Sequence, residues 1–138
     1  MGFKVLIVED EPKLREVLCD YFLNKGDSPF EAGNGTQALE LAQEQEFDAI
    51  LLDIMMPELD GFSVCRALRK DNSVPIIFLT ALSDEDDKLL GYELGADDYV
   101  TKPYSMSVLY AKTAALIKRS RGSVLSDRDR LEAAGITL

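Results

Sequence analysis

Histidine is absent from this chain of 138 residues. Its absence excludes histidine-based catalytic triads, histidine metal clusters and a histidine general base. Cysteine is scarce: Cys19 and Cys65 are too few for a disulfide framework, and both lie among apolar residues at helical spacing. We therefore expect buried free thiols in a reducing compartment.

Long hydrophobic runs are also missing. The apolar run near the N-terminus is short and is followed by three acidic residues, Glu9, Asp10 and Glu11. It predicts neither a signal peptide nor a membrane span. We expect a cytoplasmic protein that makes no contact with a membrane.

Basic residues are few relative to acidic ones. The chain has 15 Lys and Arg against 25 Asp and Glu, which gives a formal net charge of −10. Nucleic acids and anionic membranes need basic surfaces, so this chain is not expected to bind either by itself. A content of 46% hydrophobic and 29% charged residues is typical of a globular protein, and the length fits one domain.

Short apolar runs alternate with segments of helical periodicity. The runs predict strands at Phe3–Val8, Ser28–Ala32, Ala49–Leu52, Pro75–Leu79 and Asp98–Thr101. The periodic segments predict helices at Pro12–Lys25, Thr36–Gln45, Phe62–Lys70, Ser83–Leu94 and Ser105–Arg119. Five β-α units of this kind predict an α/β fold, a five-stranded parallel sheet in the flavodoxin-like order 2-1-3-4-5 with helices on both faces.

Two local expectations refine the helices. In the first helix, Leu14, Val17, Leu18 and Tyr21 follow the spacing i, i+3, i+4, i+7 and are expected to face the core. Ser83 is expected to cap the fourth helix, because a serine stands just before a group of acidic residues.

Polar residues follow four of the predicted strands. Glu9 and Asp10 follow the first strand, Asp53 the third, Thr80 the fourth and Lys102 the fifth. Taken singly, each suits a helix cap, a turn or a solvated charge, but parallel strands bring all of them to one edge of the sheet. Clustered carboxylates favour Mg²⁺, and an aspartate beside Mg²⁺ and an ammonium can act as nucleophile towards a phosphoryl group.

The segments VLIVEDEP, DAILLDIMMPELDGF, PIIFLTA and LGADDYVTKPY together resemble the response-regulator receiver domains of two-component signalling, of the OmpR/PhoB type. The resemblance covers residues 1–120 and implies the CheY-like version of the fold. It implies that Asp53 accepts a phosphoryl group from a sensor histidine kinase. It further implies Mg²⁺ as cofactor, organised by Glu9, Asp10, Asp53 and the backbone carbonyl of Met55.

The same resemblance implies a switch. Thr80 and Tyr99 would be the switch residues, Lys102 would contact the phosphoryl group, and the Lys102-Pro103 peptide would be cis. Such a protein is a regulator rather than an enzyme, limited to its own phosphorylation and slow hydrolysis of the aspartyl phosphate. Phosphorylation is expected to drive homodimerisation through the face of the fourth helix, fifth strand and fifth helix, with the interface residues Lys88, Asp97, Asp98, Lys112 and Arg119.

The last 18 residues differ in composition from the rest. Residues 121–130 are interpreted as a linker, and residues 131–138 resemble the start of a winged-helix output domain. The chain is then a fragment whose DNA-binding half, which would control transcription, is missing. The alternative is a stand-alone receiver that acts through protein contacts.

Two other functions fit the residues less well. A dehalogenase-type phosphatase needs an acid two residues after the nucleophile, and Met55 stands there. A flavin module needs a phosphate-binding loop after the first strand, where Glu9, Asp10 and Glu11 would repel phosphate.

Overall fold

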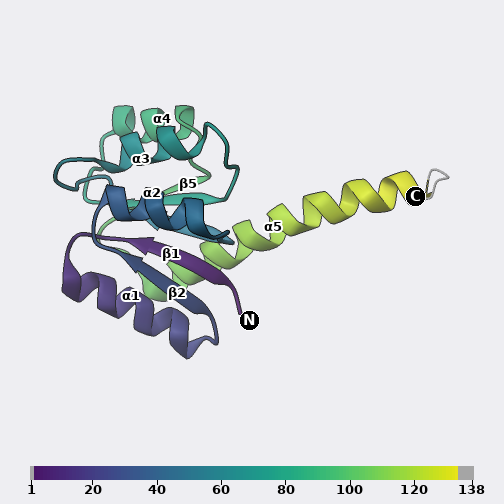
Figure 1. Cartoon of the computed structure of the whole chain (residues 1–138), viewed down its shortest axis with the longest axis horizontal. Coiled ribbons are helices and arrows are strands. Elements are labelled where there is room, and N and C mark those ends of the chain that lie inside the picture. The colour runs from purple at the N-terminus through teal and green to yellow at the C-terminus, as the bar shows by residue number, and fades with distance from the viewer. Residues whose placement is uncertain (1, 134–138) are drawn as a thin grey trace.

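The structure is a computed structural model that describes residues 2–133, with side chains through residue 122. Within that range five strands and five helices alternate along the chain (Figure 1). The strands are β1 (Lys4–Val8), β2 (Ser28–Ala32), β3 (Ala49–Leu52), β4 (Ile76–Thr80) and β5 (Asp98–Thr101). The helices are α1 (Pro12–Asn24), α2 (Gly35–Glu44), α3 (Gly61–Leu68), α4 (Glu85–Glu93) and α5 (Met106–Ala133).

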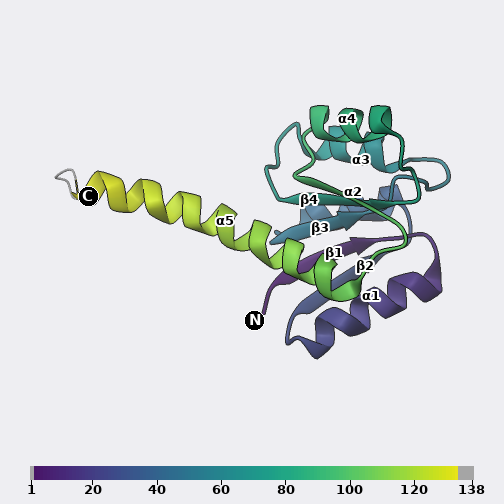
Figure 2. The ribbon, with the colours of Figure 1, turned by 180° about the vertical axis from the view of Figure 1, so that it is seen from behind.

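The strands form one parallel sheet in the order β2-β1-β3-β4-β5, which confirms the predicted topology. The helices cover both faces of this sheet: α2, α3 and α4 lie on one side and α1 and α5 on the other (Figures 1 and 2). Alternate strand residues therefore point into two separate cores, and every residue of β3 and β4 is buried.

The predicted apolar stripe of α1 was partly wrong. Leu18, Cys19 and Phe22 are the buried residues of this helix, whereas Val17 is 51% exposed. The helix packs against the sheet and against α5 together, which turns its buried face towards Cys19 and Phe22. Cys19 and Cys65 are both buried free thiols, as expected.

The start of α4 also differs from the prediction. Asp84, and not Ser83, is the N-cap residue, and its side chain makes no capping hydrogen bond. Acidic residues occupy the first turn, where they favour the positive end of the helix dipole. The acidic run therefore begins this helix without a serine cap.

Helix α5 is longer than expected. It continues through the segment interpreted as a linker and ends at Ala133, and it projects from the body of the domain (Figures 1 and 2). Arg121 holds it to the domain through an ion pair with Asp48 at 2.9 Å. Residues 121–133 include three arginines and two leucines, which are good helix formers, and no proline. Residues 131–133 of the expected output-domain segment belong to this helix, and residues 134–138 lie outside the described part.

In the described part of the chain, no helix combines the length and the apolar character needed to cross a membrane. The longest one, α5, carries charged residues along its length.

Gly61 permits the close contact of α3 with the segment that follows β3. A Cβ atom at this position would meet the backbone carbonyl of Asp53 and would lie 2.7 Å from the Cα of Ile54. The Gly61 amide donates to the carbonyl of Ile54 at 3.0 Å, so this contact is part of the loop that carries Asp53. Any side chain here must displace backbone.

We predict that Gly61→Ala lowers the free energy of unfolding by about 1–3 kcal/mol, because the added methyl group has no room. Urea denaturation measures this difference. Gly122→Ala is the matched control: no atom lies within 4 Å of the position that its methyl group would take on α5, so no loss is expected there. Equal effects of the two substitutions would contradict the steric argument.

Candidate functional site

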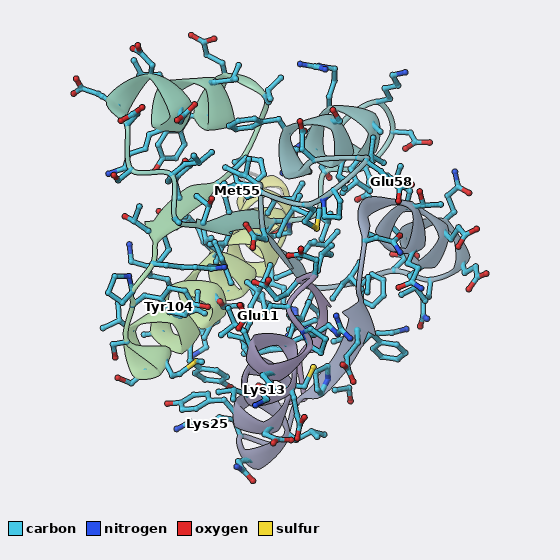
Figure 3. The ribbon with its side chains drawn as sticks, turned by 90° about the vertical axis from the view of Figure 1, so that its left-hand side faces the viewer. Glu11, Lys13, Lys25, Met55, Glu58 and Tyr104 are labelled. Carbon is cyan, nitrogen blue, oxygen red and sulfur yellow. The ribbon has the colours of Figure 1, made fainter. Side chains whose placement is uncertain are left out.

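The carboxyl ends of the five strands point to one end of the molecule, which Figure 3 views directly. Glu9 follows β1, Asp53 follows β3, Thr80 ends β4 and Lys102 follows β5. The structure thus brings together at one edge the polar residues that the sequence places far apart. Glu11 and Met55, labelled in Figure 3, come from the loops of the same end.

Three carboxylates form the centre of the site. Glu9, Asp10 and Asp53 each place an oxygen within 4.8 Å of the others. Glu9 is 2% exposed and Asp53 is 3% exposed, while Asp10 is more open to solvent. The sheet holds their backbones: the Asp53 amide donates to the carbonyl of Val8 at 3.0 Å.

Lys102 connects the carboxylates across the sheet. Its Nζ donates to Asp53 Oδ2 at 3.0 Å and to Glu9 Oε1 at 3.2 Å. The lysine is positioned by its own amide, which donates to the carbonyl of Thr80 at 2.8 Å, and its bond to Pro103 is cis, as the resemblance implied. The other oxygen of Asp53 accepts from the amide of Met55 at 3.0 Å.

Burial dominates the ionisation of Glu9. The pKa of Glu9 is raised from 4.5 to about 7: desolvation is the main cause and the charge of Asp53 adds to it, whereas the Glu11 amide and Lys102 act in the opposite direction. Burial alone lowers the pKa of Lys102, but the hydrogen bond and charge of Asp53 and the charge of Glu9 outweigh it. The ammonium therefore stays protonated between carboxylates that repel each other.

The residues fit a divalent cation. If all three carboxylates are ionised, they and the one ammonium carry a net charge of −2, and every available ligand atom is an oxygen. Such a donor set suits Mg²⁺, which prefers one or two carboxylates together with water. Asp10 is the most accessible of the three, which leaves a path for a hydrated ion.

The two expected switch residues meet at Leu82. Thr80 is fully buried, and its hydroxyl oxygen accepts from the amide of Leu82 at 3.2 Å. The Tyr99 hydroxyl donates to the carbonyl of the same residue at 2.9 Å. Tyr99 is 7% exposed and packs against Phe78, so its ring already lies inward in this structure.

The expected interface residues lie on α4, β5 and α5, and two of them pair within the chain. Lys112 Nζ lies 3.4 Å from Asp98 Oδ2, which joins α5 to β5. Asp97, which lies just before β5, pairs elsewhere: Arg69, the C-cap residue of α3, approaches its Oδ2 to 3.1 Å. Arg119 is exposed on α5.

The sequence assigned no role to two residues near the site. Arg15 donates to the carbonyl of Glu9 at 2.6 Å and to Glu31 at 3.1 Å, which secures the turn that carries the acids. Tyr104, two residues after Lys102, has a buried hydroxyl. A cation one turn after the acids is a weak signal for the first, and no sequence pattern marks the second.

We predict that Glu9→Gln stabilises the metal-free protein at pH 8 by about 1–3 kcal/mol. The folded pKa of Glu9, about 7, lies above its unfolded value of 4.5, so its favourable contribution to stability is complete below about pH 4.5 and is lost as pH rises through 7. Because the chain has no histidine, few other groups titrate in this window.

Urea denaturation in a chelating buffer at pH 5 and pH 8 measures the change. The gain should be small at pH 5 and full at pH 8. Glu11→Gln serves as the control, because it makes the same change at a neighbouring glutamate that is exposed to solvent. A gain that is independent of pH would contradict the role of Glu9 burial.

Comparison with known proteins agrees with this geometry. The family profile described as the response regulator receiver domain matches residues 5–114. A probable transcriptional regulator, ycf27, of Guillardia theta is 45% identical over 133 residues, which are 96% of this chain and 52% of that protein. The transcriptional activator protein PfeR of Pseudomonas aeruginosa is 42% identical over 86% of this chain and 39% of its own length. The chain thus spans about half, or less, of these relatives.

Solved structures show the same fold. The receiver domain of Francisella response regulator 1452 superposes with a TM-score of 0.83 at 37% identity, covering 86% of this chain and 99% of that one. The BeF₃-activated receiver domain of Klebsiella pneumoniae RstA gives a TM-score of 0.79 at 32% identity, over 83% and 97% of the two chains. Sequence profile, fold and strand-end residues agree, and this chain belongs to the response regulator receiver domain family.

Proposed function

We propose that this domain is a phosphoacceptor switch in which Asp53 receives a phosphoryl group from a phosphohistidine of a sensor histidine kinase. The observation that carries the proposal is the pairing of a buried aspartate with an ammonium at 3.0 Å, beside two further carboxylates. The kinase would supply the histidine that this chain lacks.

In the transfer, a carboxylate oxygen of Asp53 attacks phosphorus, the P–N bond to the kinase histidine breaks, and an aspartyl phosphate forms. Lys102 already donates to Asp53, so its ammonium is in place to pair with a phosphoryl oxygen. Mg²⁺, held by Glu9, Asp10, Asp53 and the Met55 carbonyl, would neutralise charge on the transferring group. Asp53 sits too deep for a bulky partner to reach except from this edge of the sheet.

The aspartyl phosphate would then offer a phosphoryl oxygen as an acceptor for the hydroxyl of Thr80. That hydroxyl accepts from the Leu82 amide, and Tyr99 donates to the Leu82 carbonyl. A movement of Thr80 towards a phosphoryl oxygen therefore releases one bond to Leu82 and alters the support of Tyr99. This shared residue gives the switch a physical connection between the site and β5.

We predict that acetyl phosphate with Mg²⁺ adds the mass of one phosphoryl group to the protein, and that Asp53→Asn abolishes the addition. Intact-mass spectrometry measures it, and hydroxylamine should remove the group because acyl phosphates react with this nucleophile. Asp71→Asn, at an exposed aspartate after α3, is the matched control and should be phosphorylated normally. An addition that persists in Asp53→Asn would overturn the assignment.

The readout proposed for the phosphorylated state is homodimerisation through α4, β5 and α5. The described surface of this face exposes Leu89 and Tyr92 of α4 and Val108 of α5, at 55%, 47% and 51%. Exposed apolar side chains in one region are typical of a protein interface. The charged residues Lys88, Asp97, Asp98, Lys112 and Arg119 would surround them, of which Asp98 and Lys112 already pair within the chain.

We predict that beryllofluoride, an acyl-phosphate mimic, shifts the wild-type protein to a dimer and that Leu89→Asp prevents the shift, because a charge would be buried in the contact. Sedimentation or gel filtration measures it. Leu23→Asp is the matched control, since Leu23 is 57% exposed on α1, outside the proposed interface. Dimerisation of Leu89→Asp with unchanged affinity would exclude this face.

The relatives named above are transcriptional regulators of about twice this length or more. We therefore infer that the domain controls transcription in the cytoplasm through a DNA-binding half that is not part of this chain. The net charge of −10 excludes the receiver itself as the DNA-binding surface. Helix α5, which projects from the domain, would then join the two halves (Figure 2).

A further inference from the structure

Tyr104 carries a buried hydroxyl without a hydrogen-bond partner among the described residues. It is the one such side-chain atom found in that part of the chain. Buried polar groups are nearly always paired in folded proteins, so an unpaired one needs an explanation. Phenylalanine would fill the same space without this penalty.

The surroundings of Tyr104 connect it to the site. The ring packs with the core under α1 and α5, and the residue lies at the same end of the molecule as Glu11 and Met55 (Figure 3). Burial raises the pKa of Tyr104 to about 12, and the charges of Lys102, Glu9 and Asp53 also act on it. The hydroxyl is therefore enclosed within electrostatic range of the ammonium and its two carboxylates.

Lys102 has more donors than lasting acceptors. Its ammonium has three N–H groups and uses Glu9 and Asp53, the same carboxylates that are proposed to hold Mg²⁺. With a divalent cation bound there, ammonium and metal compete for the same oxygens and repel each other. Lys102 then needs another acceptor, and its half-buried position limits how many lie within reach.

We propose that Tyr104 is a positioning residue whose hydroxyl oxygen accepts a hydrogen bond from the Lys102 ammonium when a cation occupies the carboxylates of Glu9, Asp10 and Asp53. The hydroxyl that is unpaired in this structure is then the acceptor for the Lys102 ammonium in the cation-bound state. This inference rests on the proposed function, because it assumes the metal site, but it concerns a residue that needs no contact with the metal or the phosphoryl group.

The test is Tyr104→Phe, which removes the hydroxyl and keeps the ring. In the metal-free protein the unfolding midpoint should rise by about 3–5 °C, since an unpaired buried group is lost. Mg²⁺ binding, measured by isothermal titration calorimetry, should weaken by about 3- to 10-fold. An unchanged Mg²⁺ affinity would overturn the proposal.

Tyr110→Phe is the matched control. The Tyr110 hydroxyl is paired, because it donates to Asp27 at 2.7 Å, and this contact joins α5 to the start of β2, away from the site. Its removal should lower the unfolding midpoint and leave Mg²⁺ affinity unchanged. A higher unfolding midpoint for Tyr104→Phe and a lower one for Tyr110→Phe would distinguish the unpaired hydroxyl of Tyr104 from the paired structural hydroxyl of Tyr110.

Lys102→Met determines whether Tyr104 acts through Lys102. In that background, Tyr104→Phe should no longer alter Mg²⁺ affinity, because the donor is gone. A weakening that persists would mean that the hydroxyl bonds a water in the site, which would overturn the proposed partner. If the wild-type protein binds no Mg²⁺, the proposed function fails. If it binds Mg²⁺ and Tyr104→Phe has the same Mg²⁺ affinity, this inference alone fails.

Discussion

The site depends on one ammonium held between two buried carboxylates. Lys102 pairs with Asp53 and Glu9, and in doing so it joins the end of β5 to the ends of β3 and β1. Without the Lys102 ammonium these carboxylates would repel each other in a poorly solvated place. The raised pKa of Glu9 shows that burial and the neighbouring Asp53 disfavour its ionised form. The three carboxylates suit a divalent cation, and in the proposed transfer the ammonium beside Asp53 would pair with a phosphoryl oxygen.

The surrounding fold makes this crowding possible. Parallel strands bring their carboxyl ends to one edge of the sheet. The helices on both faces bury every residue of β3 and β4, so the backbones of these strands are held in place. The close approach of Gly61 to the loop after Asp53 adds a further constraint on that aspartate. The repulsion among the acids is therefore sustained by hydrogen bonds and packing in the sheet.

Leu82 connects the end of β4, which lies at the site, to Tyr99 of β5. Thr80 and Tyr99 both form hydrogen bonds with its backbone, so in the proposed switch a change at Asp53 would reach β5 without a large movement. The exposed apolar residues of α4 and α5 lie on the elements that flank this strand. A shift of a few bonds can thus alter which surface is presented to a second molecule.

The sequence by itself predicted the strand order, both layers of helices and the residues that meet at one edge of the sheet. Strand periodicity and strand-end positions are local properties of the chain, and right-handed β-α-β crossovers leave few topologies. Three features differed from the sequence prediction: the buried face of α1, the cap of α4 and the continuation of α5 through the expected linker. They depend on tertiary packing or on helix propensity within a segment whose polar composition had indicated a linker. The pKa of Glu9, the pairing of Asp97 with Arg69 and the enclosed hydroxyl of Tyr104 depend on neighbours that are distant in sequence. Burial and electrostatics act through space, so only the folded structure could decide them.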